Sequence, residues 1–338
     1  MRKINGVPVE AHTDLSNLTG GEVLKWDATN TLMAWEDQDS TTFIPPTWYG
    51  DRGVFAGALG ASNGFTNSGD IEYITIATTG NATDFGDLTV VRPDTNACSN
   101  GSRGVWAGGW NTSWAAQNTM DYITISTTGN ATDFGDLATA VANEGAVSDG
   151  TKGIFAGGNA GSVTNVIQYV TISSTGDASD FGDLTVARRR VDGCNSDTRG
   201  LFGGGTGNED TIDYITMATP GNATDFGNLS AGRYSTAGVS NTTRGVFGGG
   251  CETGNCYNNV IEYVTIDTTG NATDFGDLTV GRYSARAASD NSRGVFCTGD
   301  GNPVTNTIDY ITIASAGNAT DFGDAITAMY GGGGLSGD

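Results

Sequence analysis

Short segments dense in β-branched and aromatic residues recur along the chain from about residue 51 to its end. The clearest of them read Ile-[Asp/Glu/Gln]-Tyr-[Ile/Val]-Thr or close variants, with the tyrosine at positions 73, 122, 169, 214, 263 and 310. In the first copy, Ile71 and Tyr73 fall on one face of an extended strand, while Ile74 and Ile76 fall on the other. Apolar residues on both faces predict a strand that is covered on both sides.

Each of these segments belongs to a repeat of roughly fifty residues, and six copies follow one another. Every copy also carries TGNATDFGDL or a close variant, and a basic-Gly-aliphatic-aromatic signature such as Arg52-Gly53-Val54-Phe55. The copy at 282–328 reads as four strands separated by turns, over 282–289, 294–297, 307–314 and 322–327. Four antiparallel strands in each of six units predict an all-β fold, a six-bladed β-propeller.

The spacing between these signatures separates a constant part of the repeat from a variable part. From each tyrosine to the following DFG phenylalanine is 12 residues, and from that phenylalanine to the next signature aromatic is 21. The distance from the aromatic to the next tyrosine instead runs 18, 16, 14, 12, 16 and 14 residues. Even steps lengthen a hairpin without inverting its strands. The variable segment is therefore predicted to be the tip of a hairpin.

The two ends of the repeat array predict how the ring closes. Residues 325–338 align without gaps with residues 278–291, so they supply one further first strand and stop inside the turn that follows it. Counting on by the constant spacing places Asp338 just before Asp51. We expect this C-terminal strand to complete the blade begun by residues 52–91, which removes the exposed edges of an open sheet.

Composition narrows the classes of partner. The chain has 38 acidic and 16 basic residues, a formal net charge of −22, which argues against direct contact with the phosphates of nucleic acid. The first residues lack the apolar segment of a signal peptide, and no apolar run approaches the roughly 20 residues of a membrane span. We therefore expect a soluble protein made in the cytosol, with no nucleic-acid or membrane partner.

No arrangement of residues typical of an active site is found. GxSxG, HExxH, P-loop and Cys–His patterns are missing, and the only histidine is His12. The paired aspartates of DFGD, such as Asp84 and Asp87, suit acid–base chemistry or calcium, but six copies argue against an active site, because a ring needs only one. We expect them to end a turn and to meet the repeated arginine of the second strand. The sequence predicts no enzyme, cofactor or metal site; calcium at the DFGD turns stays open.

The five cysteines do not recur at one repeat position. Cys251 and Cys256, in CETGNC at a variable tip, either pair or stay reduced. A reducing cell interior favours two free thiols, which is the interpretation we prefer from the sequence.

The variable tips carry the candidate binding residues, which are Phe65, Trp110, Trp114 and Tyr257. Aromatic residues at exposed hairpin ends make binding contacts because each buries a large area. The alternative is that they pack over neighbouring loops. Recognition is favoured by the variation of length and sequence at the tips, where the rest of the repeat is almost verbatim.

Residues 1–47 lie outside the repeat, which occupies residues 48–338. The segments GEVLKWD (21–27) and TLMAWE (31–36) predict a short hairpin, and Pro45-Pro46 predicts a stiff hinge before the ring. So small a unit cannot bury Leu24, Trp26, Leu32 and Trp35 within itself, so these residues are predicted to anchor the arm on something larger. The alternative is that the arm folds back on its own ring.

Two parts of the sequence resemble known families. The GEVLKWD-turn-TLMAWE segment is similar to short adhesion modules near the N-termini of tailed-phage fibre and other virion proteins. Units such as NVIEYVTIDTTGNATDFGDLTVGR (259–282) resemble repeats in structural proteins of marine phages, especially those of cyanobacteria (cyanophages). The ring is also similar to Kelch propellers in its Gly-Gly pairs at 108–109, 157–158 and 248–249, but it lacks the usual downstream tryptophan.

The resemblance implies a virion structural protein, made in the host cytoplasm and present in several copies per particle. The arm is then expected to dock on tail, neck or capsid proteins, and the propeller to contact a glycan or protein of the host surface, or neighbouring virion proteins. One alternative is an architectural part without receptor binding, such as a tail nozzle or capsid decoration. Another is a cellular carbohydrate-binding propeller.

Overall fold

The computed structural model describes three long stretches of the chain and four short strands before them. The stretches are 50–60, 69–207 and 209–337. The chain divides into two compact units, residues 1–45 and 46–338. In the first unit, the strands pair antiparallel as β1 (Lys3–Ile4) with β2 (Val7–Pro8), and β3 (Val23–Asp27) with β4 (Leu32–Glu36). The second pair is the predicted hairpin.

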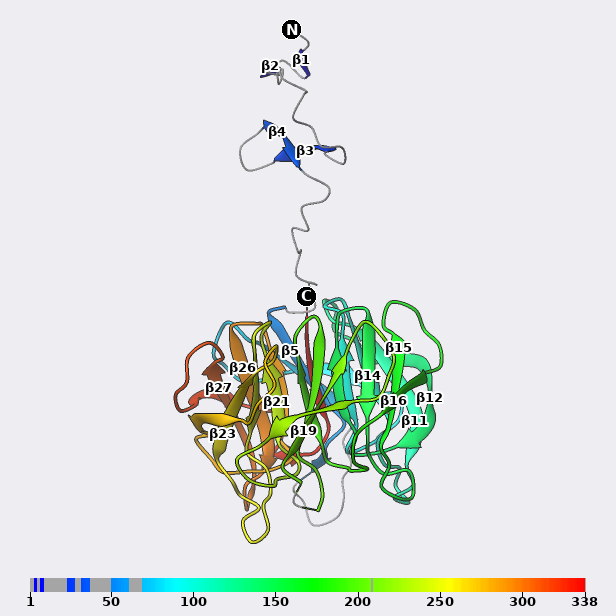
Figure 1. The fold of residues 1–338 in the computed structure, drawn as a ribbon, viewed down its shortest axis with the longest axis vertical. Helices are drawn as coiled ribbons and strands as arrows, with labels where there is room; N and C mark the ends of the chain where they lie inside the picture. The colour runs from blue at the N-terminus through cyan, green and yellow to red at the C-terminus, as the bar shows by residue number, and fades with distance from the viewer. Residues whose placement is uncertain are drawn as a thin grey trace. The chain divides into compact units, whose positions relative to one another are not determined.

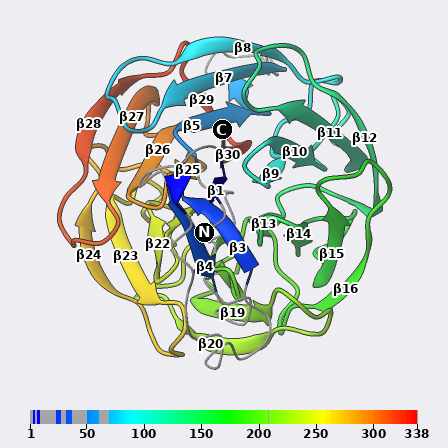
Figure 2. The same cartoon turned by 90° about the horizontal axis from the view of Figure 1, so that it is seen from above.

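Six four-stranded antiparallel sheets form the second unit and stand around a central axis as the blades of a propeller (Figure 1, Figure 2). The predicted fold class is confirmed. From the axis outward, blade 1 contains β30 (Gly333–Gly337), β5 (Arg52–Ala56), β7 (Asp70–Thr75) and β8 (Thr83–Asp87); blade 2 contains β9 (Asn96–Ser99), β10 (Arg103–Ala107), β11 (Gln117–Thr124) and β12 (Thr132–Val141); blade 3 contains β13 (Gly145–Ser148), β14 (Lys152–Ala156), β15 (Val166–Thr171) and β16 (Ser179–Asp183).

The other three blades repeat this order. Blade 4 contains β17 (Asp192–Asn195), β18 (Arg199–Gly203), β19 (Thr211–Thr216) and β20 (Thr224–Asn228); blade 5 contains β21 (Ala237–Ser240), β22 (Arg244–Gly248), β23 (Val260–Thr265) and β24 (Thr273–Asp277); blade 6 contains β25 (Arg286–Ser289), β26 (Arg293–Asp300), β27 (Val304–Thr312) and β28 (Thr320–Asp324). A short additional pair joins β6 (Leu59–Gly60) to β29 (Met329–Tyr330).

The C-terminal strand closes the ring, as the spacing predicts. β30 pairs antiparallel with β5, from Gly333 opposite Ala56 to Gly337 opposite Arg52. The innermost strands consist mainly of small residues, which lets six of them meet at the axis around a cavity of about 90 Å³. Ser99 donates a hydrogen bond to the Ser336 carbonyl across the blade 1–2 junction, so the closing strand is tied to both of its neighbours.

Hydrophobic packing between blades forms the core. On the third strand of blade 1, Ile71, Ile74 and Ile76 are all buried, which confirms that both faces of this strand are covered. In each blade the tyrosine of the third strand meets the DFG phenylalanine edge to face; the Tyr73 and Phe85 ring centroids are 5.9 Å apart. Such aromatic pairs add about 0.5–1.5 kcal/mol beyond their burial.

The strand order gives the ring two different faces. The short turns between first and second strands, and between third and fourth strands, lie on one side, which we call the turn face. The variable segments between second and third strands, and the connections to the next blade, lie on the other side, which we call the tip face. Gly50 and Asp51 lead into β5, and β30 ends beside Arg52, so both ends of the ring lie at the turn face.

The repeated TGNATDFGD sequence forms hydrogen bonds between each outer strand and the next blade. At the blade 3–4 junction, the Asn222 side-chain oxygen accepts a hydrogen bond from the Asp183 N–H at 3.1 Å, and the Ala223 N–H donates to the Asp183 carbonyl at 2.8 Å. Gly182 has φ +150°, and a Cβ there would lie 2.4 Å from the Gly221 carbonyl oxygen. Equivalent side-chain contacts occur at all six junctions, which explains the near-verbatim repetition.

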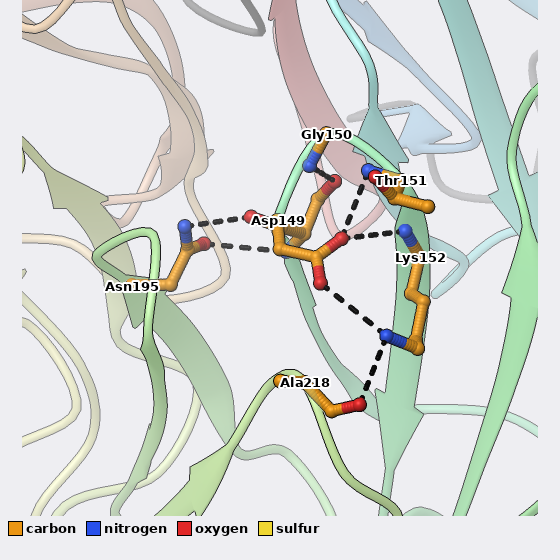
Figure 3. Close-up of polar contacts among 7 residues, drawn as sticks. Asp149, Gly150, Thr151, Lys152, Asn195 and Ala218 are labelled. Carbon is orange, nitrogen blue, oxygen red and sulfur yellow. Dashed lines mark hydrogen bonds and ion pairs between the residues drawn. The ribbon is translucent and has the colours of Figure 1, made fainter. Parts of the chain in front are cut away.

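The basic residue of the signature in the second strand forms a second set of contacts between adjacent blades. Arg103 lies over the Tyr122 ring, 4.4 Å from its centroid, and donates a hydrogen bond to the Ile172 carbonyl of the next blade at 3.0 Å. In blade 3 the cation is Lys152. Figure 3 shows this lysine bonded to the Ala218 carbonyl of blade 4 and paired with Asp149, whose carboxylate also caps the turn.

The expectation that the DFGD aspartates meet these arginines is wrong. In the part of the chain that the structure describes, no DFGD aspartate forms an ion pair with a second-strand arginine. The DFGD sequence is instead used through its backbone, and the second-strand arginines are occupied by tyrosine faces and carbonyl oxygens of the adjacent blade.

Buried ion pairs use the acidic residue of the Ile-x-Tyr segment instead. The pairs are Arg92–Asp121, Arg188–Asp213, Arg233–Glu262, Arg282–Asp309 and Arg286–Glu72, with side chains that are at most 2% exposed. For blade 3 the arginine position is Val141, at the end of β12 in blade 2, and there the acid is replaced by Gln168, which bonds the Thr139 backbone twice at 3.0 Å. At this position of the third strand, a buried acid is thus always paired with an arginine, and the one blade without such a pair carries a neutral amide.

Candidate functional site

Three of the four predicted tip residues lie in the described part of the chain, and all three are on the tip face. Trp114 is 46% exposed and meets Trp110 edge to face, with centroids 6.3 Å apart. Tyr257 is 42% exposed and packs against Tyr283 at 6.3 Å. Phe65 lies outside the described residues, as do the side chains of Leu24, Trp26, Leu32 and Trp35 in the arm.

The tip of blade 5 differs from the sequence-based expectation. Cys251 and Cys256 form a disulfide, so the preference for two free thiols is wrong. The loop between the two cysteines forms a tight turn, in which Glu252 and Asn255 bond each other through their backbones. This turn brings the two thiols together, which the argument from cellular redox conditions did not consider. The disulfide closes residues 252–255 into a small loop and holds Cys256, the residue directly before Tyr257.

The tip face also carries the exposed apolar surface of the ring. In the described stretches, every large hydrophobic side chain that is strongly exposed lies either in a variable tip or in a connection from an outer strand to the next blade: Val90, Val91, Trp114, Val163, Val186, Tyr257, Val280 and Ile326. The turn face carries none of them. The strongly exposed large hydrophobic side chains of the described stretches are thus confined to one side of the ring.

At the axis, the tip face opens into a mouth built by one residue from each blade. These residues stand nine positions after each DFG phenylalanine and have a left-handed backbone: Asp94 (φ 55°), Asn143 (62°), Arg190 (59°), Ser235 (53°), Ser284 (53°) and Gly331 (74°). From Asn143 onward, each N–H donates to the carbonyl of its counterpart in the preceding blade, at 2.7–3.1 Å. We call these six residues the mouth ring.

The mouth ring surrounds a cavity of about 50 Å³. Its backbone repeats six times, but its side chains are a carboxylate, an amide, a guanidinium, two hydroxyls and a glycine. Thr95, Glu144, Asp192 and Thr236 also line the cavity. Neither oxygen of Glu144 has a hydrogen-bond partner, nor do the hydroxyls of Thr95 and Thr236, although all three residues are at most 3% exposed. Buried polar groups without partners are uncommon in folded proteins.

The predicted tip residues are connected to this mouth. The Trp110 side chain lies close enough to the Asp94 carboxyl group to favour its charged form, and Tyr257 packs at a tilt against Tyr283, the residue before Ser284 in the mouth ring. In each blade the residue before the mouth ring also bonds the base of the tip through its backbone. The tips and the mouth therefore form one continuous surface.

Burial shifts the carboxyl groups at the mouth toward their protonated forms. Desolvation raises the pKa of Glu144 to about 8, opposed only in part by nearby backbone N–H groups and the Arg92 charge. Desolvation likewise raises the pKa of Asp192 to about 7, although the Gly193 and Gly238 N–H groups donate to its carboxylate. The pKa of Asp94 is raised by burial against the opposing charge of Arg190. Burial thus reduces the negative charge that these carboxyl groups would otherwise bring to the lining.

Sequence reasoning missed the mouth ring. A signal was present: within the constant 21-residue stretch, the position nine residues after the DFG phenylalanine holds five residue types in six copies. When the side chain at one position differs between copies of an otherwise constant repeat, the repeated backbone places chemically different groups at equivalent points of the ring. The sequence alone does not show that these six residues converge at the axis.

Two general classes of site were also considered. In the described stretches, no group of three or more His, Cys, Asp or Glu residues is placed to hold a metal ion. The same stretches contain no helix of the length and apolar character that crossing a membrane requires. No protein-family model matches the chain, and no curated protein is significantly similar to it in sequence.

Proposed function

We propose that this chain is a non-enzymatic appendage of a phage particle, which docks through its N-terminal arm and recognises a partner through the tip face. The observation that carries the proposal is the opposition of the two faces. The chain enters the ring at Gly50 on the turn face, whereas the variable tips, the exposed apolar side chains and the mouth ring lie on the other side. A ring that is attached to a particle through its turn face leaves the tip face free.

The assignment to a virion rests on the resemblance of residues 21–36 and of the repeats to phage structural proteins. The recognition role rests on the composition of the tip face, because exposed aromatic residues supply most of the energy of many interfaces. The chain would be present in several copies, alongside tail, neck or capsid proteins, and its partner would be a glycan or protein of the host surface.

Particles that carry altered forms of the chain test both halves of the proposal. Replacing Trp26 and Trp35 with alanine should remove the chain from purified particles, measured by quantitative mass spectrometry of the virion. Replacing Trp114 and Tyr257 with alanine should leave incorporation unchanged and slow adsorption to host cells. Exposed Val163, replaced by alanine, is a control for a change at a tip that carries no aromatic residue.

Each outcome separates the candidate roles. Normal incorporation of the arm variant would refute docking through the arm. Normal adsorption by particles with the tip variant would refute recognition through these aromatic residues and favour the architectural role. Absence of the wild-type chain from particles would overturn the virion assignment.

A further inference from the structure

We propose that the mouth ring binds a neutral saccharide, with the sugar seated over the axial cavity between Arg190 and Asp94 and beside the tyrosines of blades 5, 6 and 1. This inference rests on the proposed recognition role of the tip face and names the chemical class of its ligand. Four observations support it, and each concerns a different property of the mouth.

The first observation is the array of unused hydrogen-bonding groups. The Glu144 carboxyl and the Thr95 and Thr236 hydroxyls line the cavity, are almost fully buried and have no partner in the fold. Leaving such a group unpaired lowers the stability of the fold, and a ligand that pairs with it removes that cost. A ligand with several hydroxyl groups can supply both donors and acceptors to these atoms.

The second observation is the mixture of fixed polar groups at the entrance. Asn143 donates to the Asp94 carboxylate at 3.5 Å, and the Arg190 Nε donates to the Asn143 side-chain oxygen at 3.2 Å. A carboxylate, an amide and a guanidinium are thus held in one chain of contacts on one side of the mouth. Groups held in place before binding lose less entropy when the ligand arrives.

The third observation is a set of three tyrosines that adjoin the mouth ring in sequence and stand outside the lining of the cavity itself. Tyr234, Tyr283 and Tyr330 precede the mouth-ring residues of blades 5, 6 and 1, and all three are only partly buried. Arg190 lies over the Tyr234 ring, 5.5 Å from its centroid, and the Tyr283 hydroxyl donates to Asp300 at 2.9 Å. Aromatic faces next to a few convergent polar groups are typical of small-molecule sites, and they suit the C–H faces of a sugar ring.

The fourth observation is the charge of the lining. Three carboxyl groups surround the mouth, so a phosphate or carboxylate ligand could bind only while these groups stay protonated, which adds a penalty to its binding. Arg190 stands at the same entrance and disfavours a cation. A neutral ligand with many hydroxyl groups avoids both penalties, because it needs hydrogen bonds rather than an ion pair.

The cavity itself holds only a few water-sized volumes, about 50 Å³, which is less than a whole sugar ring. The expected pose therefore places one or two hydroxyl groups in the cavity. The rest of the ring lies at the mouth, where Trp110 and Tyr257 on the surrounding tips can contact further sugar units of an oligosaccharide.

The test measures binding to the full chain in solution. The probes are glucose, galactose, mannose, N-acetylglucosamine and their short oligomers, first by saturation-transfer NMR and then by titration calorimetry. At least one probe is expected to bind with a dissociation constant in the micromolar to millimolar range. Asp94→Ser and Arg190→Ser should each weaken that binding about tenfold or more, because each removes a charged hydrogen-bonding group.

Serine is chosen because it occupies the same left-handed position in blades 5 and 6, so the ring backbone already accommodates it. Asp51→Ser, at an exposed position on the turn face, is the matched control and should leave binding unchanged. Unfolding midpoints close to that of the wild type show that the mouth variants are folded. A second pair, Thr95→Val and Thr236→Val, removes the unpaired hydroxyls and should weaken binding without changing any charge.

Three results would overturn the inference: no binding of any probe, binding that the mouth variants leave unchanged, or binding at the mouth of phosphate or spermidine in place of sugars. These results are distinguishable from failure of the proposed function. A chain that fails to bind sugars but still supports adsorption through its tips loses only the ligand class. A chain that binds sugars at the mouth but is missing from particles loses only the virion assignment.

Discussion

Exchanging the buried ion pair Arg188–Asp213 for the uncharged pair of blade 3 should restore most of the stability that either single exchange removes. The corresponding residues for blade 3 are Val141, at the end of β12, and Gln168. The variants are therefore Arg188→Val, Asp213→Gln and the combination of both. Blade 3 shows that the repeat can accommodate an uncharged pair at these positions.

The magnitude follows from the contacts that each change leaves behind. Arg188→Val leaves the Asp213 carboxylate buried, with hydrogen bonds only from the Thr185 N–H and hydroxyl. Asp213→Gln leaves the Arg188 guanidinium buried, 3.0 Å from the Phe202 carbonyl. Removing one partner of a buried ion pair costs about 3–5 kcal/mol, and we expect that loss from each single variant.

The double variant should cost far less. By analogy with Gln168 and Thr139, a glutamine at position 213 can bond the backbone of Val186, the residue equivalent to Thr139, through both atoms of its amide. The remaining cost is the space left by the shorter valine, about 1–2 kcal/mol. The coupling free energy between the two changes is then at least about 3 kcal/mol, at the upper end of measured cycles.

Equilibrium urea unfolding of the four proteins, followed by tryptophan fluorescence, gives the cycle. Arg188→Val combined with Asp309→Gln, which belongs to blade 6, is the control and should show additive losses because the two residues share no contact. A double variant in blade 4 whose loss equals the sum of the two single losses would refute the reasoning.

Three further predictions concern the fastening between blades, the mouth and the blade 5 tip. Gly182→Ala should lower the unfolding free energy by about 2 kcal/mol or more, because residue 182 has a positive φ and its Cβ would clash with the Gly221 carbonyl. Gly221→Ala is the control, since a Cβ there has open space around it, and it should change the unfolding free energy by less than about 1 kcal/mol. The pKa of Glu144 rises from 4.5 to about 8 on folding, so its contribution to stability is present at acidic pH and is lost as the pH rises from about 4.5 to 8. Glu144→Gln should flatten that part of the plot of urea midpoint against pH. A difference from wild type that does not change with pH would contradict this. Reduction of Cys251–Cys256 should expose the loop to limited proteolysis while lowering ring stability by at most about 2 kcal/mol, because the closed loop is short; unchanged cleavage would show that the disulfide does not hold the loop.

The fold could be predicted because its determinants are local and repeated. The strand pattern around Tyr73 and the turn residues of TGN specify one blade, and six copies specify six. Closure followed from counting alone, since the constant spacing leaves one first strand at the C-terminal end of the array. The positions of Trp110, Trp114 and Tyr257 on the tip face followed from the same count.

What could not be predicted depends on which residues meet across the ring. Arg286 and Glu72 are 214 residues apart in sequence and pair because blade 6 and blade 1 are neighbours. The partners of the DFGD aspartates were assigned wrongly because a nearby cation in sequence was taken as a nearby cation in space. The mouth ring was missed for the same reason, since its six residues share a repeat position but no local motif.

The way the ring closes makes the order of synthesis matter. β30 follows every other blade strand along the chain, so a ribosome has made all the other strands before β5 can receive its inner partner. During that interval β5 presents an open edge, and the last strand of one copy can complete the first blade of another when many nascent chains are close together. A chain cut short before Gly333 can never finish its ring, so only chains that reach this strand would offer an assembled surface to any partner.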